Sequence, residues 1–325
     1  MYDLSVNYMG LELENPLIVG SSPLTDSVEK LVLLEENGAG AVVLKSLYEE
    51  ELRDTGEECK CNYHPEAYNY DIMDAEMIYG ISNYIYMISD AKQYVNIPII
   101  ASLNCVDEKW WQDYPLKIED AGADGIELNI SYLSFHKDTH PLDIFSKYAD
   151  VIHSIKGKIK IPIAVKISPY SCSIPYMIKQ LQDAGADAIV MFSRYFKVGI
   201  DIDSLCCLPV NYYSSPVETY KVLRWIGIVH KQMPDMTICG STGIHSANEA
   251  IQHLLAGATA FQMVSSILNN GHEVIKEVLG NIKRWMIEKE FSTIDEFRGY
   301  IHKIHESSMF NSIHYNQLTE SKFLE

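Results

Sequence analysis

The chain has 325 residues and a formal net charge of −18, which argues against nucleic acid or anionic membranes as partners. Its 47% hydrophobic and 22% charged residues are typical of a folded soluble protein, and it contains neither the roughly 18-residue apolar run that spans a bilayer nor a signal peptide. The seven cysteines are odd in number and irregularly spaced, so we expect reduced thiols, a cytoplasmic protein and no metal site.

Apolar segments alternate with helical segments along the chain. Residues 1–14 alternate apolar and polar side chains around Met9 and Gly10, which predicts a β-hairpin. Eight buried strands are predicted at 15–22, 39–46, 98–104, 125–131, 161–168, 188–193, 236–240 and 260–265. Helical periodicity predicts a helix containing Leu31 and Leu34, and further helices at 110–121, 142–155, 174–184, 217–232, 246–255 and 272–287.

This alternation indicates a parallel sheet covered by helices, a fold of the α/β class. Eight units in roughly 270 residues favour a closed (β/α)8 TIM barrel, and no G-x-G-x-x-G follows the first strand as a Rossmann domain would require. We predict a single domain over 1–325, with the hairpin at 1–14, the barrel at 15–290 and a C-terminal helical tail at 291–325. Two long stretches, 48–75 and 201–216, follow strands and are expected on the C-terminal face as lids or oligomer contacts.

Small polar residues after the last two strands indicate an anion site. One loop reads Gly240-Ser241-Thr242-Gly243, and the other begins with Ser265-Ser266. Gly240 and Gly243 permit a sharp turn, and loop N–H groups beside a helix N-terminus suit a phosphate. Loops in this position often form such a site in barrels. Two ordinary turns made of small residues are the alternative.

Lys45 and Lys166 stand at the ends of apolar strands. A lysine in that position loses hydration unless it meets an anion, although a side chain that reaches out to solvent is the simpler alternative. Together with the amide of Asn129 and the phosphate loop, the two lysines indicate a planar, electron-rich, phosphorylated ligand. Flavin mononucleotide (FMN) fits that description.

Several distinctive sequence blocks follow one another along nearly the whole chain. They are Asn15-Pro16, the run from Gly38 to Ser46, Glu127-Leu128-Asn129-Ile130-Ser131, Val165-Lys166-Ile167-Ser168-Pro169, and the segment from Gly243-Ile244 to Gly257-Ala258. In these blocks the chain resembles the dihydroorotate dehydrogenase family of FMN barrels, in particular its soluble class. The order and spacing of the blocks are more specific than any one of them.

The resemblance implies an FMN-dependent oxidoreductase that acts on CH–CH donors in pyrimidine biosynthesis. It places Lys166 near the flavin N1/O2 edge, Lys45 near N5/O4 and the substrate, and Asn129 against both. The implied catalytic residues are Lys45, Tyr132 and Asn129, and the implied FMN-binding residues are Ser21, Ser22, Lys45, Ser46, Asn129, Lys166, Ser193, Gly240, Thr242, Gly243, Ser265 and Ser266. The resemblance also implies a homodimer and leaves open a separate electron-acceptor protein.

The chain departs from the family pattern where substrate would bind. The family reads Asn-x-Ser-Cys-Pro-Asn, but here Tyr132 replaces the catalytic Cys and Ser134 replaces the second Asn. The Asn after strand six is missing from Phe192-Ser193-Arg194, and a third motif is reduced at 77–83. An unperturbed tyrosine has a pKa of about 10 and is a poor base near neutrality. These changes argue against dihydroorotate as the substrate.

Two other hypotheses stay open at this stage. A degenerate barrel could act as a binding protein without redox chemistry, because the β-branched Thr242 and Val264 hinder close approach of a phosphate to the backbone. A sugar-phosphate lyase or isomerase could use Lys45 or Lys166 as a Schiff base. Flavin content separates the first hypothesis from the oxidoreductase, and borohydride trapping tests the second.

Overall fold

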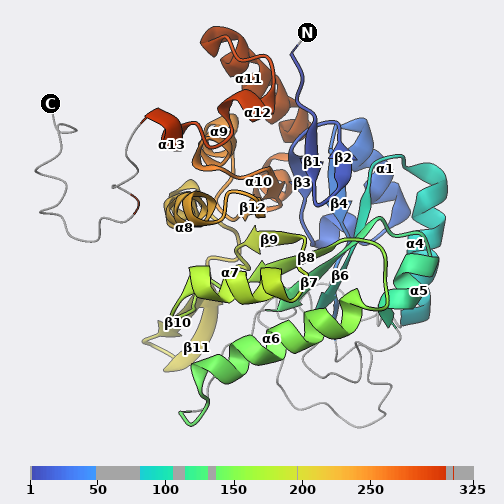
Figure 1. Ribbon diagram of the computed structural model, residues 1–325, viewed down its shortest axis with the longest axis vertical. Coiled ribbons are helices and arrows are strands. Elements are labelled where there is room, and N and C mark those ends of the chain that lie inside the picture. The colour runs from blue at the N-terminus through green and yellow to red at the C-terminus, as the bar shows by residue number, and fades with distance from the viewer. Residues whose placement is uncertain are drawn as a thin grey trace, which may run out of the picture.

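The computed structural model describes residues 2–48, 81–104, 114–130, 137–195, 197–304 and 310. Its central strands are surrounded by helices (Figure 1). The barrel strands are β3 (Leu17–Val19), β4 (Ala41–Val43), β6 (Ile99–Asn104), β7 (Gly125–Ile130), β8 (Ile163–Ile167), β9 (Ala188–Met191), β12 (Thr237–Ser241) and β13 (Ala260–Met263). They pair in parallel in chain order, and the β13–β3 and β4–β6 pairings close the cylinder, which confirms the predicted (β/α)8 barrel. A short β5 (Leu47–Tyr48) also pairs with β6.

The surrounding helices are α1 (Val28–Glu36), α4 (Ile81–Tyr94), α5 (Tyr114–Asp120), α6 (Pro141–Lys156), α7 (Ile174–Asp183), α8 (Thr219–Gln232), α9 (Ala247–Ala256), α10 (Ser265–Asn270) and α11 (Glu273–Lys289). Four of the turns back to a strand use a glycine with φ between +93° and +119°, namely Gly38, Gly122, Gly185 and Gly257. Glycine adopts this conformation without a steric penalty, which explains the Gly-Ala steps of the sequence. In the described part of the chain, no helix is long and apolar enough to cross a bilayer.

The segment after β13 differs from the prediction. Ser265 and Ser266, expected in a small polar loop, instead begin the helix α10. Ile267 in its first turn is 1% exposed, so packing of this side chain favours a helix. The helix ends at Gly271, which has φ +86°.

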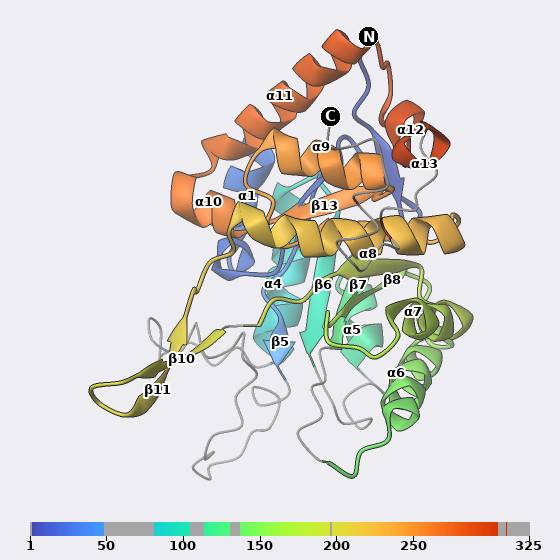
Figure 2. The same cartoon turned by 90° about the vertical axis from the view of Figure 1, so that its left-hand side faces the viewer.

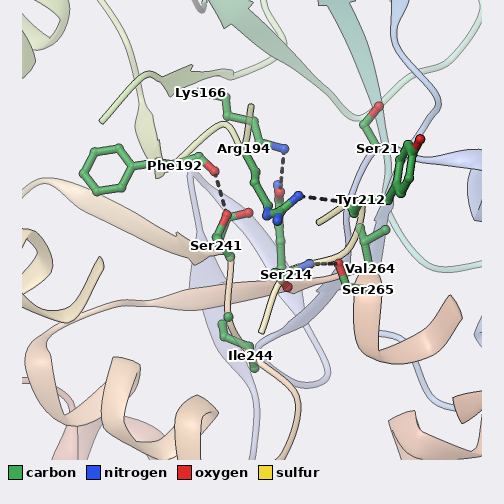
Figure 3. A pocket seen from close by; sticks show the side chains of 13 residues that line it. Ser21, Lys166, Phe192, Arg194, Tyr212, Ser214, Ser241, Ile244, Val264 and Ser265 are labelled. Atoms are coloured by element: carbon green, nitrogen blue, oxygen red, sulfur yellow. Dashed lines mark hydrogen bonds between the residues drawn. The ribbon is translucent and has the colours of Figure 1, made fainter. Parts of the chain in front are cut away.

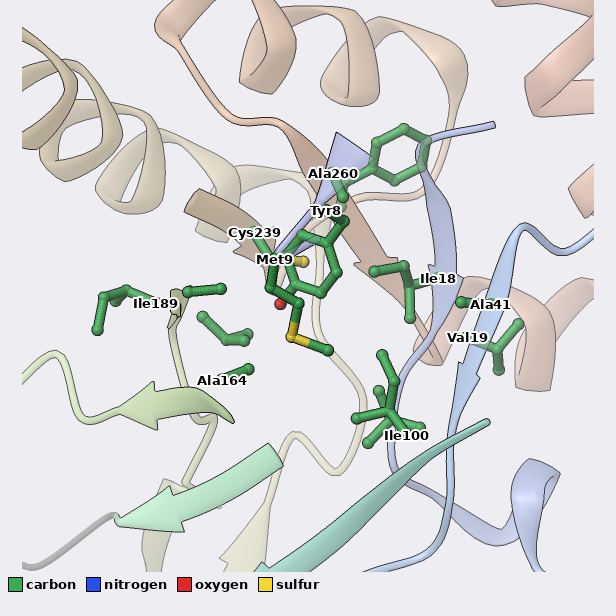
Figure 4. Packing of buried hydrophobic residues seen from close by; sticks show 14 of the residues in the cluster. Tyr8, Met9, Ile18, Val19, Ala41, Ile100, Ala164, Ile189, Cys239 and Ala260 are labelled. Atoms are coloured by element: carbon green, nitrogen blue, oxygen red, sulfur yellow. The ribbon is translucent and has the colours of Figure 1, made fainter. Parts of the chain in front are cut away.

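The predicted N-terminal hairpin is present and closes one end of the barrel. Strands β1 (Val6–Tyr8) and β2 (Leu11–Leu13) pair antiparallel. At their turn, Tyr8 and Met9 insert among side chains of the barrel interior such as Ala164 and Cys239 (Figure 4). The close fit leaves no room at Gly125, where a Cβ would lie 2.6 Å from Met9 Cε. Side chains therefore fill the amino-terminal end of the barrel.

The stretch 201–216, predicted as a long loop, contains half of a second hairpin. Strands β10 (Lys197–Asp201) and β11 (Cys206–Val210) pair antiparallel, and the hairpin stands away from the barrel (Figure 2). The β-branched and apolar alternation around Ile200 and Leu208 favours strands. The short η3 (Pro216–Glu218) then leads into α8. The other predicted insertion, 48–75, lies outside the described residues except for Tyr48.

The tail begins with two short helices, α12 (Ile294–Phe297) and α13 (Ile301–Ile304). Ile294 and Phe297 are fully buried, and Phe297 packs against Trp285 with ring centroids 5.0 Å apart. The backbone N–H of Asp3 donates to Ser292 O at 2.9 Å, so the start of the tail is joined to the start of the chain. Residues 305–309 and 311–325 of the predicted tail lie outside the described residues.

We expect His253 to make the fold less stable in acid. Its side chain is fully buried on α9, with Nε2 2.8 Å from Thr219 Oγ1, and burial lowers its pKa from 6.5 to about 3. In the unfolded chain this histidine binds a proton near pH 6.5, but in the folded chain it stays neutral until about pH 3. Its contribution to the free energy of unfolding is therefore complete above pH 6.5 and is lost as the pH falls toward 3. We expect a loss of about 1.4 kcal/mol per pH unit below 6.5 from this group.

Urea titrations between pH 8 and pH 4 measure this loss. His253→Gln is expected to be less stable at pH 8, because it disturbs a buried contact, but to show a shallower fall toward pH 4. An equally steep fall in the variant would mean that other groups cause the acid sensitivity. His230, whose pKa burial and the charge of His302 lower to about 4, is the next group to replace.

Candidate functional site

Polar side chains occupy the carboxyl end of the barrel interior. Alternate residues of a strand face the same side. Ser102 and Asn104 on β6 therefore share a face, as do Glu127 and Asn129 on β7, and Asn129 is in register with Lys166 on β8. All five residues are buried. A charged residue at the centre of an apolar strand is the signal for Glu127 in the sequence, but no role was predicted for this residue.

A cavity opens at this end of the barrel, where Lys166, Arg194 and Ser21 lie around one space (Figure 3). Its lining combines the ends of five barrel strands, β3, β8, β9, β12 and β13, with the segment that follows the β10–β11 hairpin. The lining residues are Ser21, Lys166, Phe192, Arg194, Tyr212, Ser214, Ser241, Thr242, Gly243, Ile244, Gln262, Val264 and Ser265. Five of the predicted binding residues are among them, namely Ser21, Lys166, Thr242, Gly243 and Ser265.

Lys166 belongs to a buried three-membered network. Its Nζ donates to Gln262 Oε1 at 3.1 Å and lies 3.5 Å from Glu127 Oε1. Gln262 Nε2 in turn donates to Glu127 Oε2 at 2.5 Å. Lys166 thus stays buried on the cavity wall. The alternative that its side chain reaches out to solvent is wrong. Sequence reasoning missed Gln262, which occupies an inward position of an otherwise apolar strand.

Hydroxyl groups connect the cavity to the neighbouring strands. Ser21 Oγ lies 3.0 Å from Ser46 Oγ, and Ser46 Oγ lies 2.7 Å from Ser102 Oγ. Ser193 Oγ donates to Asn129 Oδ1 at 2.9 Å. Ser46 is therefore joined to the cavity lining through Ser21. Asn129 and Ser193 do not line the cavity either, but Asn129 is in register with Lys166, and Ser193 lies between Phe192 and Arg194 in the chain.

The sharp turn of the predicted phosphate loop lies at Thr242 and Gly243, with φ of +83° and +85°. Thr242 Oγ1 donates to Phe192 O at 3.3 Å, which ties its side chain to the neighbouring strand end. At Gly243 a Cβ would overlap the backbone nitrogen of Thr219 at the start of α8. Only glycine therefore fits where this loop passes the helix.

Three predicted binding residues lie behind the cavity. Gly240 is inside β12, not at the turn, and a Cβ there would overlap His253 Nδ1. Ser22 caps η1 (Pro23–Thr25) and donates to Gly20 O at 3.0 Å. Ser266 is fully buried and donates to His245 O at 3.1 Å. These contacts give each residue a role in packing the loops.

Arg194 fastens the segment after the hairpin to the barrel. Its guanidinium donates to the carbonyl oxygens of Tyr212 at 2.9 Å, Asn211 at 2.6 Å and Tyr213 at 2.9 Å. It also pairs with Glu218, through Nε–Oε2 at 3.2 Å. Although burial opposes the charge on Glu218, hydrogen bonds and charge from Arg194 hold the pKa of that carboxyl below its usual value. Arg194 therefore holds residues 211–215 against the barrel. This segment contributes Tyr212 and Ser214 to the lining and forms one wall of the cavity.

A second attachment joins this wall to the loops after β12 and β13. The backbone N–H of Ser214 donates to Ser265 Oγ at 3.0 Å, and Ser214 Oγ lies 3.0 Å from His245 Nε2. Ser265 therefore contacts the wall and the cavity at once. The sequence showed the loops but gave no sign that residues 211–215 would cover them.

Of the other predicted catalytic residues, Lys45 does not line the cavity and Tyr132 is not described by the structure. Lys45 follows β4 and is partly buried, outside the lining of this cavity. Tyr132 lies outside the described residues, as do Ser131 and Ser134 and the start of the 77–83 motif. Across the ranges that the structure describes, no three His, Cys, Asp or Glu side chains are grouped so as to hold a metal ion.

The sequence of this chain is similar to those of several known proteins. The sequence model of the family described as "Dihydroorotate dehydrogenase" matches residues 3–286. The chain is 28% identical to the dihydroorotate dehydrogenase B (NAD(+)) catalytic subunit of Thermoplasma volcanium, over 92% of this chain and 98% of that protein. It is 29% identical to the protein of the same name from Thermococcus kodakarensis, over 91% and 97%. It is 22% identical to the NAD-dependent dihydropyrimidine dehydrogenase subunit PreA of Escherichia coli, over 91% and 76%.

Proposed function

This chain belongs to the dihydroorotate dehydrogenase family of oxidoreductases, and on that premise we propose that it binds FMN and oxidises a small CH–CH donor other than dihydroorotate. The observation that carries this proposal is Lys166, a buried ammonium group on the wall of a polar cavity at the carboxyl end of the barrel. Bound FMN supplies the acceptor for the hydride. The protein supplies charge, orientation and the enclosure of the site.

The residues present fit such a group. Asn104 Nδ2 is buried at the end of β6 and has no hydrogen-bond partner among the described residues, so it can donate to a polar ring edge. Lys166 and Asn129 stand on the two strands that follow, and all three would hold the flavin ring. The phosphate would be held by the turn at Gly243 and by Ser265, which line the cavity together.

The proposal about the substrate rests on the family's substrate-binding asparagines and catalytic base, which this chain lacks. The Asn that the family has after strand six is missing from Phe192-Ser193-Arg194, and Ser193 donates to Asn129. Arg194 beside it is committed to three carbonyl groups and to Glu218. Each missing amide hydrogen bond costs dihydroorotate roughly 1 kcal/mol, and Tyr132 stands where the family has its base. A substrate with fewer hydrogen-bonding groups than dihydroorotate suits this site better.

The electron acceptor is proposed to be a separate protein of the cytoplasm. The relatives are named as subunits, which supports a partner of that kind. A homodimer also fits, because apolar side chains of the β10–β11 hairpin, such as Ile200 at 71%, are exposed.

An anaerobic titration with dihydroorotate tests the substrate. We expect the flavin absorption of the FMN-loaded protein to remain unchanged on adding dihydroorotate, while dithionite bleaches it fully. The expectation follows from the lost amides and the missing base. Bleaching by dihydroorotate at a catalytically useful rate would show that the chain is a dihydroorotate dehydrogenase in activity as well as in family.

A further inference from the structure

The carboxylate of Glu127 is buried below the proposed flavin site. It is 1% exposed and lies inside the barrel on β7, two residues before Asn129. Its Oε2 accepts from Gln262 at 2.5 Å, and its Oε1 faces the ammonium group of Lys166 at 3.5 Å. Lys166 is the only cation paired with it among the described residues.

Each charge of this buried ion pair is stabilised by the other. Removing one partner leaves the other charge without solvent or counter-charge, which is strongly unfavourable. Gln262 completes the arrangement, since its amide oxygen accepts from Lys166 while its amide nitrogen donates to Glu127. Within the part of the chain that the structure describes, Gln262 and Glu127 hold the Lys166 ammonium on the cavity wall, at 3.1 Å and 3.5 Å.

Nearby groups do not replace this charge balance. Burial, together with the charges of Cys239 and Glu127, raises the pKa of Tyr8, and burial and Glu127 raise the pKa of the Cys239 thiol. Both groups are therefore neutral near pH 7. Below the cavity, the charge of Lys166 is offset by Glu127.

We propose that Glu127 is a positioning residue that holds Lys166 on the cavity wall and offsets its charge, and that it thereby lowers the reduction potential of bound FMN. The inference rests on the proposed function, because it requires a flavin beside Lys166. A flavin gains negative charge on reduction, and a nearby ammonium group favours that form. Glu127 weakens this preference, so its carboxylate sets how readily the protein is reduced.

Glu127→Gln tests the inference because glutamine keeps the size of the side chain and can still accept from Gln262. In the FMN-loaded variant we expect the ratio of reduced to oxidised flavin, at a fixed solution potential, to rise about tenfold. For a two-electron couple this equals an upward shift of about 30 mV. Glu127→Asp keeps the charge but moves it away from Lys166, so its potential is expected between those of the wild type and Glu127→Gln.

Cys239→Ala is the matched control, since it alters a buried residue of the same barrel interior without changing a charge. We expect its potential to equal that of the wild type. A potential in Glu127→Gln equal to or below the wild-type value would overturn the inference. If Glu127→Gln does not fold, the comparison of Glu127→Asp with the wild type decides, and an unchanged or lowered potential there counts against it.

The two proposals fail in different ways. A wild-type protein that binds no FMN contradicts the proposed function, and the inference falls with it. A wild-type protein that binds FMN, with variants that do not shift the potential, contradicts the inference alone. Thermal unfolding of the protein before FMN is added gives an independent reading, because Glu127→Gln and Lys166→Met should each lower the Tm and the double variant should recover part of the loss.

Discussion

Replacing Arg194 with alanine is expected to weaken FMN binding roughly 100-fold. The side chain makes charge-assisted hydrogen bonds to three carbonyl groups and to Glu218, and it is 16% exposed. Losing the equivalent of one or two such bonds costs about 3 kcal/mol. Since each 1.4 kcal/mol is tenfold in affinity, the release of the wall formed by residues 211–215 accounts for the expected change. Fluorescence titration with FMN measures it.

Arg284→Ala is the matched control for this experiment. Its guanidinium donates to Asn281 Oδ1 at 2.9 Å on the exposed surface of α11, and the residue does not line the cavity. We expect wild-type FMN affinity in that variant. Arg194→Lys should recover only part of the loss, because an ammonium group cannot contact several carbonyl groups in the plane of a guanidinium. Unchanged FMN affinity in Arg194→Ala would mean that the wall does not contribute to binding.

Gly243→Ala is expected to destabilise the fold by about 3 kcal/mol or more and to prevent FMN binding by the fraction that still folds. Two causes combine here. The residue has φ +85°, which costs an alanine about 1 kcal/mol, and the added Cβ would overlap the backbone nitrogen of Thr219. Relief of that overlap requires the loop to move away from α8, and the loop lines the cavity.

Gly38→Ala separates the two causes. Gly38 also has a positive φ, +93°, but the nearest atom to its Cβ would be Leu279 Cδ1 at 3.5 Å, an ordinary contact. We expect a loss of about 1 kcal/mol there and unchanged FMN affinity. Urea unfolding measures both variants, and equal losses at the two positions would rule out the overlap at Thr219 as a cause.

The barrel could be predicted because each of its parts has a local signal. Continuous apolar strands, helices ended by glycine and the alternation around Met9 each indicate one element of the fold, and the number of units then favours closure. The β10–β11 hairpin was missed in part because its strands stand away from the barrel and lack a buried face. The start of α10 was missed because two serines resemble a loop.

The site could be predicted in part. Lys166 and Asn129 were identified because a polar residue at the end of an apolar strand has a local signature. Glu127 and Gln262 were not, since their role depends on strands far apart in the sequence, β7 and β13, meeting across the barrel. Gly240 shows the opposite error, because its glycine is required by His253 behind the strand and not by a turn.

The flavin content of the freshly purified protein shows most directly whether this chain binds FMN. We expect flavin absorption bands and the release of close to one FMN per chain on denaturation, because Lys166, Gly243 and Ser265 line one polar cavity that fits this cofactor. A colourless protein that also fails to bind added FMN would contradict the proposal that this barrel is a flavoprotein. The barrel would then belong to the family by descent while lacking its chemistry.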